Sequence, residues 1–385
     1  MLQSLSRPAS VGVAVSYERD ADAAVQDAVS QLDTGDICFA LVLIPDGLHL
    51  DRLAHALDRD LEGTPVFGCT TAGQITPAGY DTEALLIITF PKRHFRCASL
   101  LIDPLKPMSI QQIAADARRT ATQFRKTADW SRLALIFADG LSKQEDMLVM
   151  ALEMGLDEMP VFGGSAGNGL HFRETFVLQG GAFHTNAALL LILETDLEFT
   201  GLGFDHFLPT EKQMVVTHAV PEERLVLELN GAPAAPEYAR LVGVGVDDLS
   251  PQVFAENPIL VRNNMNYHVR AIQEAPGAHA LSFLSAIDDG LLLTLGRGKE
   301  ILRTLEAGLD VKSSQGRPPD FILGFDCVLR KLEIEQKQLS GEVSEIFRNH
   351  KVLGFNTYGE QTCGVHVNQT FVGVAFFEPK KRDLH

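Results

Sequence analysis

Three aspartates at the ends of apolar runs are the first residues whose type and spacing could do chemistry. ICFALVLIPDG carries Asp46, RLALIFADG carries Asp139 and FILGFDC carries Asp326. Continuous apolar runs are typical of strands buried on both faces, and carboxylates at neighbouring strand ends can converge on a metal ion. The alternative, which we favour, is that each aspartate caps the following helix by accepting hydrogen bonds from its free N–H groups.

Cysteine is the other candidate for chemistry. Cys69 in PVFGCTTAG lies at a strand-to-turn junction, where amide dipoles could lower a thiol pKa, and Cys363 follows a later glycine turn. Neither has a base and an orienting group beside it, as a nucleophile needs, so we expect no enzyme. The five cysteines form no C-x-x-C pair. This pattern favours a reduced, cytoplasmic protein over a disulfide or zinc scaffold.

The glycine turn around Cys69 occurs three times. PVFGCTTAG at 65–73 is matched by PVFGGSAG at 160–167 and by VLGFNTYGE at 352–360. The spacing between the second and third copies is about twice the spacing between the first and second. The shorter of these spacings marks VFAENP at 253–258 as either a degenerate fourth copy or a coincidence. Each copy follows one of the apolar runs and precedes another strand-like segment, at 82–90, 185–194 and 368–378.

A helix is predicted between each apolar run and its glycine turn. Apolar residues recur there at three- or four-residue spacing: Leu50, Leu53, Leu57 and Leu61; Met147, Ala151 and Met154; Leu339, Val343, Ile346 and Phe347. A helical crossover between strands implies parallel pairing. The predicted fold class is therefore α/β, with repeated strand–helix–strand units forming sheets flanked by helices in two fused modules.

Composition sets the domain organisation and the classes of partner. We expect a lead-in segment at 1–29, an N-terminal module of two units at 30–220 and a C-terminal module at 221–385, with the polar stretch THAVPEERL at the seam. A formal charge of −17 opposes binding to nucleic acid or to an anionic membrane. The apolar runs are shorter than the roughly 20 residues that a membrane span needs.

The motifs together resemble the FIST domains, an N-terminal and a C-terminal module found in bacterial sensory proteins. GCTTAGQI at 68–75 and VFGGSAGN at 161–168 are similar to the glycine motifs of the first module, and the motifs of the second follow in the family's order: LELNGAPA (227–234), NYHVRAI (266–272), AIDDGLLLTL (286–295), GFDCVLR (324–330) and GFNTYGEQ (354–361). Gln74 and Asn168 replace the family's usual Glu and Asp.

A chain of both modules that ends in GFNTYGEQTCGVHVNQT resembles the nitric-oxide-sensing FIST subgroup called NosP. That resemblance implies a haem cofactor, nitric oxide as the signal, and a partner histidine kinase that acts on cyclic-di-GMP signalling and biofilm dispersal. The alternative is a haem-free sensor of the same fold that closes on a small, amino-acid-like ligand. A homodimer is compatible with either.

If haem is bound, its iron needs a protein ligand, usually His, and apolar walls. His366 is our first candidate, because it follows the third glycine turn and could project near the strand ends. His184 begins a matching His-x-Asn, so both histidines could instead be structural residues duplicated with the unit. His268 lies beside Arg270, which could pair with a propionate.

The third glycine turn differs from the other two. Tyr358 and Glu360 stand where the first copy carries Ala72 and Gln74. A side chain that is small in other copies and large in this one indicates specialisation, so we include both residues in the candidate haem site. The alternative is that looser packing at the third turn allows these larger side chains without any special function.

Overall fold

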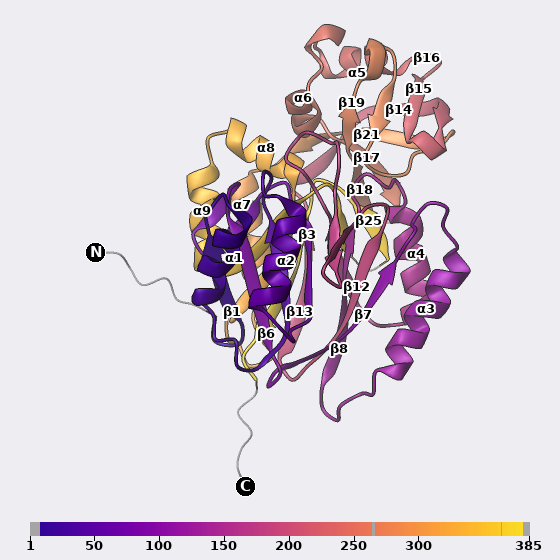
Figure 1. Ribbon diagram of the computed structural model, residues 1–385. Helices are drawn as coiled ribbons and strands as arrows, with labels where there is room; N and C mark the ends of the chain where they lie inside the picture. The colour runs from indigo at the N-terminus through magenta and orange to yellow at the C-terminus, as the bar shows by residue number, and fades with distance from the viewer. Residues whose placement is uncertain (1–7, 264–265, 363, 380–385) are drawn as a thin grey trace.

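The three apolar runs form strands that are buried on both faces. In the computed structural model, which describes residues 8–263, 266–362 and 364–379, these are β2 (Ile37–Ile44), β8 (Ser131–Ala138) and β22 (Phe321–Cys327) (Figure 1). Each pairs in parallel with the strand that leads into a glycine turn, namely β3 (Val66–Thr70), β9 (Val161–Ser165) and β23 (Val352–Thr357). The predicted α/β fold class, with helix crossovers, is confirmed.

Three units of the same element order make up the body of the protein. Unit 1 adds β1 (Gly12–Ser16), α1 (Ala21–Ser30), α2 (Leu50–Asp60), β4 (Gln74–Thr76), β5 (Gly79–Asp81) and β6 (Leu85–Pro91). Unit 2 adds β7 (Phe95–Ile102), α3 (Ile110–Gln123), α4 (Glu145–Leu156), β10 (Val177–Gln179), β11 (Ala182–His184) and β12 (Ala188–Thr195). Unit 3 adds β13 (Glu198–Phe204), α7 (Ile301–Leu309), α8 (Val328–Gln336), α9 (Ser340–Asn349), β24 (Glu360–Thr362), β25 (Val365–Val367) and β26 (Phe371–Phe377).

Each unit gives the short hairpin after its glycine turn to the sheet of another unit. The strand orders are β1-β6-β2-β3-β10-β11, β7-β12-β8-β9-β24-β25 and β13-β26-β22-β23-β4-β5. The hairpin of unit 1 thus completes the sheet of unit 3, that of unit 3 completes unit 2, and that of unit 2 completes unit 1. The exchange closes the three units into a ring.

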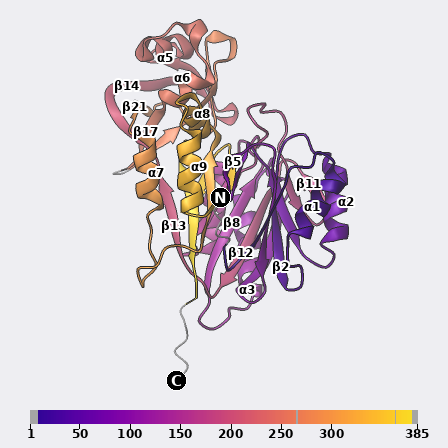
Figure 2. The same ribbon diagram turned by 90° about the vertical axis from the view of Figure 1, so that its left-hand side faces the viewer.

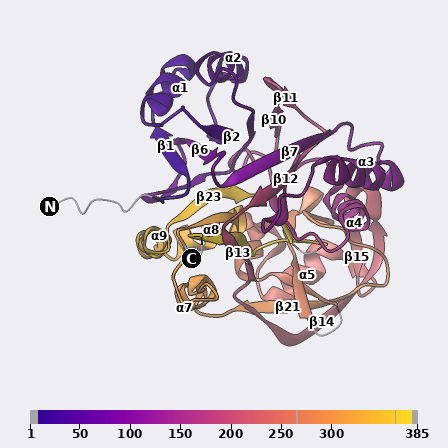
Figure 3. The same cartoon turned by 90° about the horizontal axis from the view of Figure 1, so that it is seen from below.

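The inner faces of the three sheets share one apolar core. Alternate residues of the central strands, such as Leu41, Leu135 and Leu323, point into it, and their neighbours point to the helices outside. Seen from below, the pairs α1–α2, α3–α4 and α7–α9 stand at three corners around the sheets (Figure 3). Strands covered on both sides explain the continuous apolar runs of the sequence.

A backbone ring closes the centre, where the glycine turns meet. The amide N–H of Ala72 donates to the Asn356 carbonyl at 3.0 Å, that of Gly167 to the Thr70 carbonyl at 3.0 Å, and that of Tyr358 to the Ser165 carbonyl at 3.2 Å. A Cβ on Gly167 would lie 2.9 Å from both the N and the Cβ of Ala72. Glycine is required at this turn because the units approach so closely.

Unit 3 is interrupted by an inserted subdomain, residues 207–298, which stands at one end of the body (Figures 1 and 2). It contains β14 (Phe207–Val220), β15 (Leu225–Leu229), β16 (Ala232–Pro233), α5 (Ala234–Val242), α6 (Pro251–Glu256), β17 (Ile259–Asn263), β18 (Asn266–Arg270), β19 (Ile272–Glu274), β20 (Leu281–Phe283) and β21 (Leu292–Gly298), with 3-10 turns at Pro221–Glu223, Val246–Asp248 and Pro276–Ala278. VFAENP falls on α6, so it is no fourth copy. The predicted division at residue 220 coincides with the end of β14 and stays a prediction.

Candidate ligand-binding site

A pocket of about 850 Å³ lies where the inserted subdomain meets the body. Unit 3 supplies β13, β25 and β26, unit 2 supplies Phe162 of β9, and the subdomain supplies β14 and β18. Its size falls within the range of small-molecule and cofactor sites, which favour domain junctions. Residues from three separate parts of the chain therefore converge on one ligand-sized space.

The walls of this pocket, which we call the junction pocket, combine apolar and polar side chains. The apolar ones include Phe162, Phe204, Phe207, Val365, Val367 and Val372. Two glycines of β13 keep the space open, since a Cβ on Gly203 would meet nothing closer than 4.0 Å, and a Cβ on Gly201 would collide with the Phe162 ring. Such a mixed lining suits a ligand with both an apolar part and polar groups.

Several polar side chains line the junction pocket. His268 and Tyr267 of β18, Lys299 and Asp205 are the charged or titratable ones among its lining residues. Partial burial, and then the nearby Arg270 charge, lower the pKa of His268, so its imidazole is neutral at pH 7. A neutral imidazole is the form that ligates metals. Of the predicted histidines, His268 is the one that faces this space.

His366 lies on β25 between Val365 and Val367, but its side chain points away from the junction pocket. Successive residues of a strand face opposite sides, and those two valines line the pocket. The buried ring has Nδ1 3.2 Å from Gln361 Nε2 and Nε2 3.4 Å from the Leu284 carbonyl. Burial lowers the pKa of His366.

A cluster of buried charges lies on the same side as the His366 ring. Arg224 Nη2 donates to Glu145 Oε2 at 2.6 Å and to Asp146 Oδ2 at 3.1 Å. Arg270 Nη1 contacts Asp146 Oδ1 at 3.4 Å and donates to the His366 carbonyl at 3.2 Å. Arg270 therefore binds this cluster, and no propionate partner is needed to explain its place.

This charge cluster joins the inserted subdomain to the body, and Arg270 is the one of its four charged residues that the sequence marked as a candidate. The arginines belong to the subdomain, while the two acids begin α4 of unit 2. Arg224 and Glu145 are both almost fully buried. Strand β25 separates the two sites by face, whereas on β18 His268 of the junction pocket and Arg270 of the cluster are two residues apart and project from the same face. The two sites therefore share β18 and β25.

Tyr358 and Glu360 are buried away from the junction pocket. The Tyr358 hydroxyl donates to the Asn168 carbonyl at 3.1 Å and accepts from the Asn168 amide at 3.0 Å. Glu360 Oε2 accepts from the hydroxyl of Thr370 at 2.6 Å, and Oε1 accepts from the Thr357 hydroxyl. Thr370 lines the pocket, so Glu360 lies directly behind its wall.

His184 is not the structural counterpart of His366. In the hairpins, His184 pairs with Val177, which is opposite Cys69, whereas His366 pairs with Gln361, which is opposite Gly163. The matching His-x-Asn letters are thus offset by one residue, which turns the two rings to opposite faces. His184 Nδ1 instead lies 3.7 Å from Asp103 Oδ2. Neither residue is part of the lining of the junction pocket.

The predicted helix caps are wrong. The residues before α2, α4 and α8 are His49, Gln144 and Cys327, not the aspartates. Asp326 lies inside its strand and accepts from Arg330 Nε at 2.7 Å, whereas Asp139 follows its strand and accepts from the Asn186 amide at 2.5 Å. The aspartates therefore occupy different positions in their units.

The thiols offer no reactive site among the described residues. Burial raises the pKa of Cys69, which belongs to the shared core. Cys363 lies outside the part of the chain that the structure describes. Within that part, no three His, Cys, Asp or Glu side chains come together as a metal site would require. No helix there is long and apolar enough to cross a membrane.

The fold and the junction pocket define a mixed α/β protein of repeated units with a ligand-sized site between an inserted subdomain and its body. Two family descriptions match the chain: FIST N domain over residues 38–232 and FIST C domain over residues 234–363. The chain therefore belongs to the FIST family, whose domains are small-ligand sensing modules of signalling proteins and are in general non-catalytic. No curated protein matches it.

Proposed function

We propose that this FIST protein binds haem in the junction pocket, senses nitric oxide there, and passes the signal to a partner histidine kinase. The observation that supports it is the pocket of about 850 Å³ between the body and the inserted subdomain, with apolar side chains and a neutral imidazole, His268, on its walls. His268 would hold the iron and Lys299 a propionate. Haem iron with one protein ligand supplies an open position for a diatomic gas.

The surroundings of the pocket would turn binding into a signal. Its occupant would contact both the body and the inserted subdomain, and two of its wall strands, β18 and β25, are joined by the charge cluster through Arg270 and the His366 carbonyl. A ligand shifts an equilibrium only by the difference in its affinity for two protein states. The contacts of a ligand at this junction would change if the subdomain moved relative to the body, so its affinity would differ between the two positions.

Absorption spectroscopy of haem-reconstituted protein tests this proposal. We expect a stoichiometric Soret band that shifts with nitric oxide, and we expect His268→Ala to lose it. His366→Ala should keep the band, because the His366 ring faces the charge cluster. His218→Ala, an exposed histidine of the subdomain, is the matched control. A wild-type protein that stays colourless contradicts haem binding, and loss of the band in His366→Ala alone contradicts the assignment to His268.

A smaller pocket supports the haem-free alternative. About 160 Å³ of space beside the first glycine turn is lined by Asp46, Lys331 and Glu335. Lys331 is largely buried and contacts the Ala72 carbonyl at 3.4 Å and Glu335 at 3.5 Å, both long distances. Charges of both signs suit an amino-acid-like zwitterion. Calorimetry tests this alternative. We expect an amino acid to bind to the colourless wild-type protein and to bind more weakly to the Lys331→Met variant.

A further inference from the structure

The outward face of α4 carries three exposed methionines. Met147, Met150 and Met154 have 41%, 51% and 51% of their surface exposed. The spacing of Met147, Ala151 and Met154 predicted a helix, which α4 confirms, but both methionines lie on its exposed side. Ala151 is buried, and the inner face is formed with it by Leu148, Leu152 and Leu156.

Helix α4 is thus apolar on both of its faces, although only one is covered. The other large apolar side chains that are exposed among the described residues are spread over other elements: Tyr17, Leu170, Leu208, Val215 and Leu292. A helix that is apolar all round is normally buried on both sides. Clustered exposed methionines are typical of surfaces that bind a partner, because their flexible side chains adapt to it.

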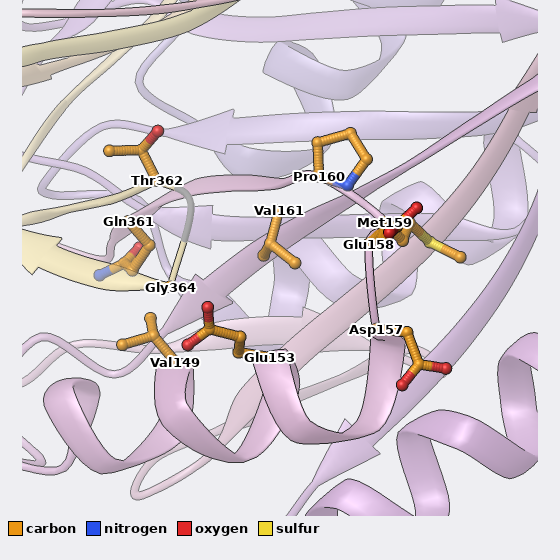
Figure 4. Close-up of a pocket in the computed structure, with 10 residues that line it drawn as sticks. All are labelled: Val149, Glu153, Asp157, Glu158, Met159, Pro160, Val161, Gln361, Thr362 and Gly364. Atoms are coloured by element: carbon orange, nitrogen blue, oxygen red, sulfur yellow. The ribbon is translucent and has the colours of Figure 1, made fainter.

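One flank of the methionine face is acidic. A hollow of about 210 Å³ between α4 and the β24–β25 hairpin is lined by Glu153, Asp157 and Glu158 with Val149 and Val161. Figure 4 shows Val149 and Glu153 on α4 facing the segment with Gln361 and Gly364. The other flank is α3, where Arg118 approaches Asp157 at 3.9 Å, an exposed pair that binds weakly.

We propose that the methionine face and its acidic flank dock an amphipathic helix of a partner protein, with an apolar stripe and with Lys or Arg on one side. Apolar residues at helical spacing would cover the methionines, and the basic side would face Glu153, Asp157 and Glu158. A second copy of this chain fits worse, because each copy carries −17 and repels the other. Three half-exposed side chains also offer far less than the ~800 Å² per partner of a stable dimer.

A designed probe tests the docking surface without knowledge of the natural partner. The probe is a fluorescent peptide of about 18 leucine and lysine residues with leucine at helical spacing, and its binding to the full chain is measured by anisotropy. We expect the Met147→Gln, Met150→Gln, Met154→Gln triple variant to bind at least roughly tenfold more weakly. Val215→Thr with Leu292→Gln, a cross-strand apolar pair on the subdomain, is the matched control and should bind as the wild type does.

Charge is tested separately. Glu153→Gln with Asp157→Asn should weaken binding and reduce its dependence on salt. The same peptide with glutamate in place of lysine should not bind. Equal binding of the glutamate peptide, equal binding by the triple variant, or no binding of the lysine peptide to the wild type would each overturn the proposal. So would a wild-type dimer in sedimentation that the triple variant makes monomeric, since the occupant would then be a second copy. These tests do not depend on haem.

Discussion

At the scale of single residues, Glu360 is a carboxyl group whose charge at neutral pH is changed by the fold. Burial raises its pKa from 4.5 to about 8, although Thr357 and Thr370 donate to it. Between these values the folded protein holds a proton that the unfolded chain releases. The free energy of unfolding therefore falls as pH rises from about 4.5 to about 8, and stays lower above that range.

Glu360→Gln should remove this pH dependence, because the neutral amide can accept from Thr370 and donate to Thr357. We expect the variant to be more stable than the wild type by about 4–5 kcal/mol at pH 9 and by little at pH 5. Urea unfolding at the two pH values measures the difference. Glu153→Gln on the exposed side of α4 is the control, and an equal effect of Glu360→Gln at both pH values would contradict the buried, protonated carboxyl.

The sequence could identify candidate residues by their type, but not the side of the strand toward which each side chain points. His366 does lie after the third glycine turn, and Arg270 does lie near it. The face of a strand on which a ring projects changes with a shift of one residue, and that shift separates His184 from His366. No local pattern places His268 in the junction pocket, because that pocket is built by residues from three parts of the chain.

At the scale of elements, the charge cluster determines how the inserted subdomain is held. Arg224→Met would keep the volume of the side chain but leave the buried Glu145 without its partner. We expect a loss of about 3 kcal/mol, because an uncompensated buried charge costs more than the pair contributes. Hydrogen exchange should show lost protection in the subdomain first.

The control for this variant is Arg240→Met. Arg240 lies on the same subdomain and pairs with Glu237 at 2.8 Å, but its side chain is 66% exposed, so removing it should change stability little. Equal effects of the two variants would mean that Arg224 does not join the subdomain to the body. Chemical unfolding and hydrogen exchange on both proteins provide the comparison.

The long elements followed from the sequence, and the short ones did not. β2, β8 and β22 are continuous apolar runs, and α2 and α9 show helical periodicity, because local burial dictates both patterns. The exchanged hairpins consist of strands of three residues, which pair with segments of other units. Their partners depend on tertiary packing that no local pattern records. The spacing of the methionines identified α4 as a helix but not its buried face, because the outer face of this helix is also apolar.

At the scale of the whole molecule, three units that exchange hairpins should unfold together. Each sheet is incomplete without a hairpin from another unit, and all three inner faces share one core. The repeat was visible in the sequence, but the exchange that closes it was not. The glycine turns, which the repeated motif marked, are the points at which the chain passes from its own sheet to the next.

Gly167→Ala tests this closure at the centre. The new Cβ would lie 2.9 Å from the Ala72 nitrogen and 3.2 Å from Tyr358 Cε1, so the backbone ring must shift. We expect a loss of about 2–3 kcal/mol, a single thermal transition at lower temperature, and reduced amide protection in all three sheets. Gly341→Ala on α9, where a Cβ meets nothing within 4 Å, should be neutral or slightly stabilising. Loss of protection confined to the sheet of unit 2 would show that the units unfold independently, and that the exchanged hairpins do not couple them.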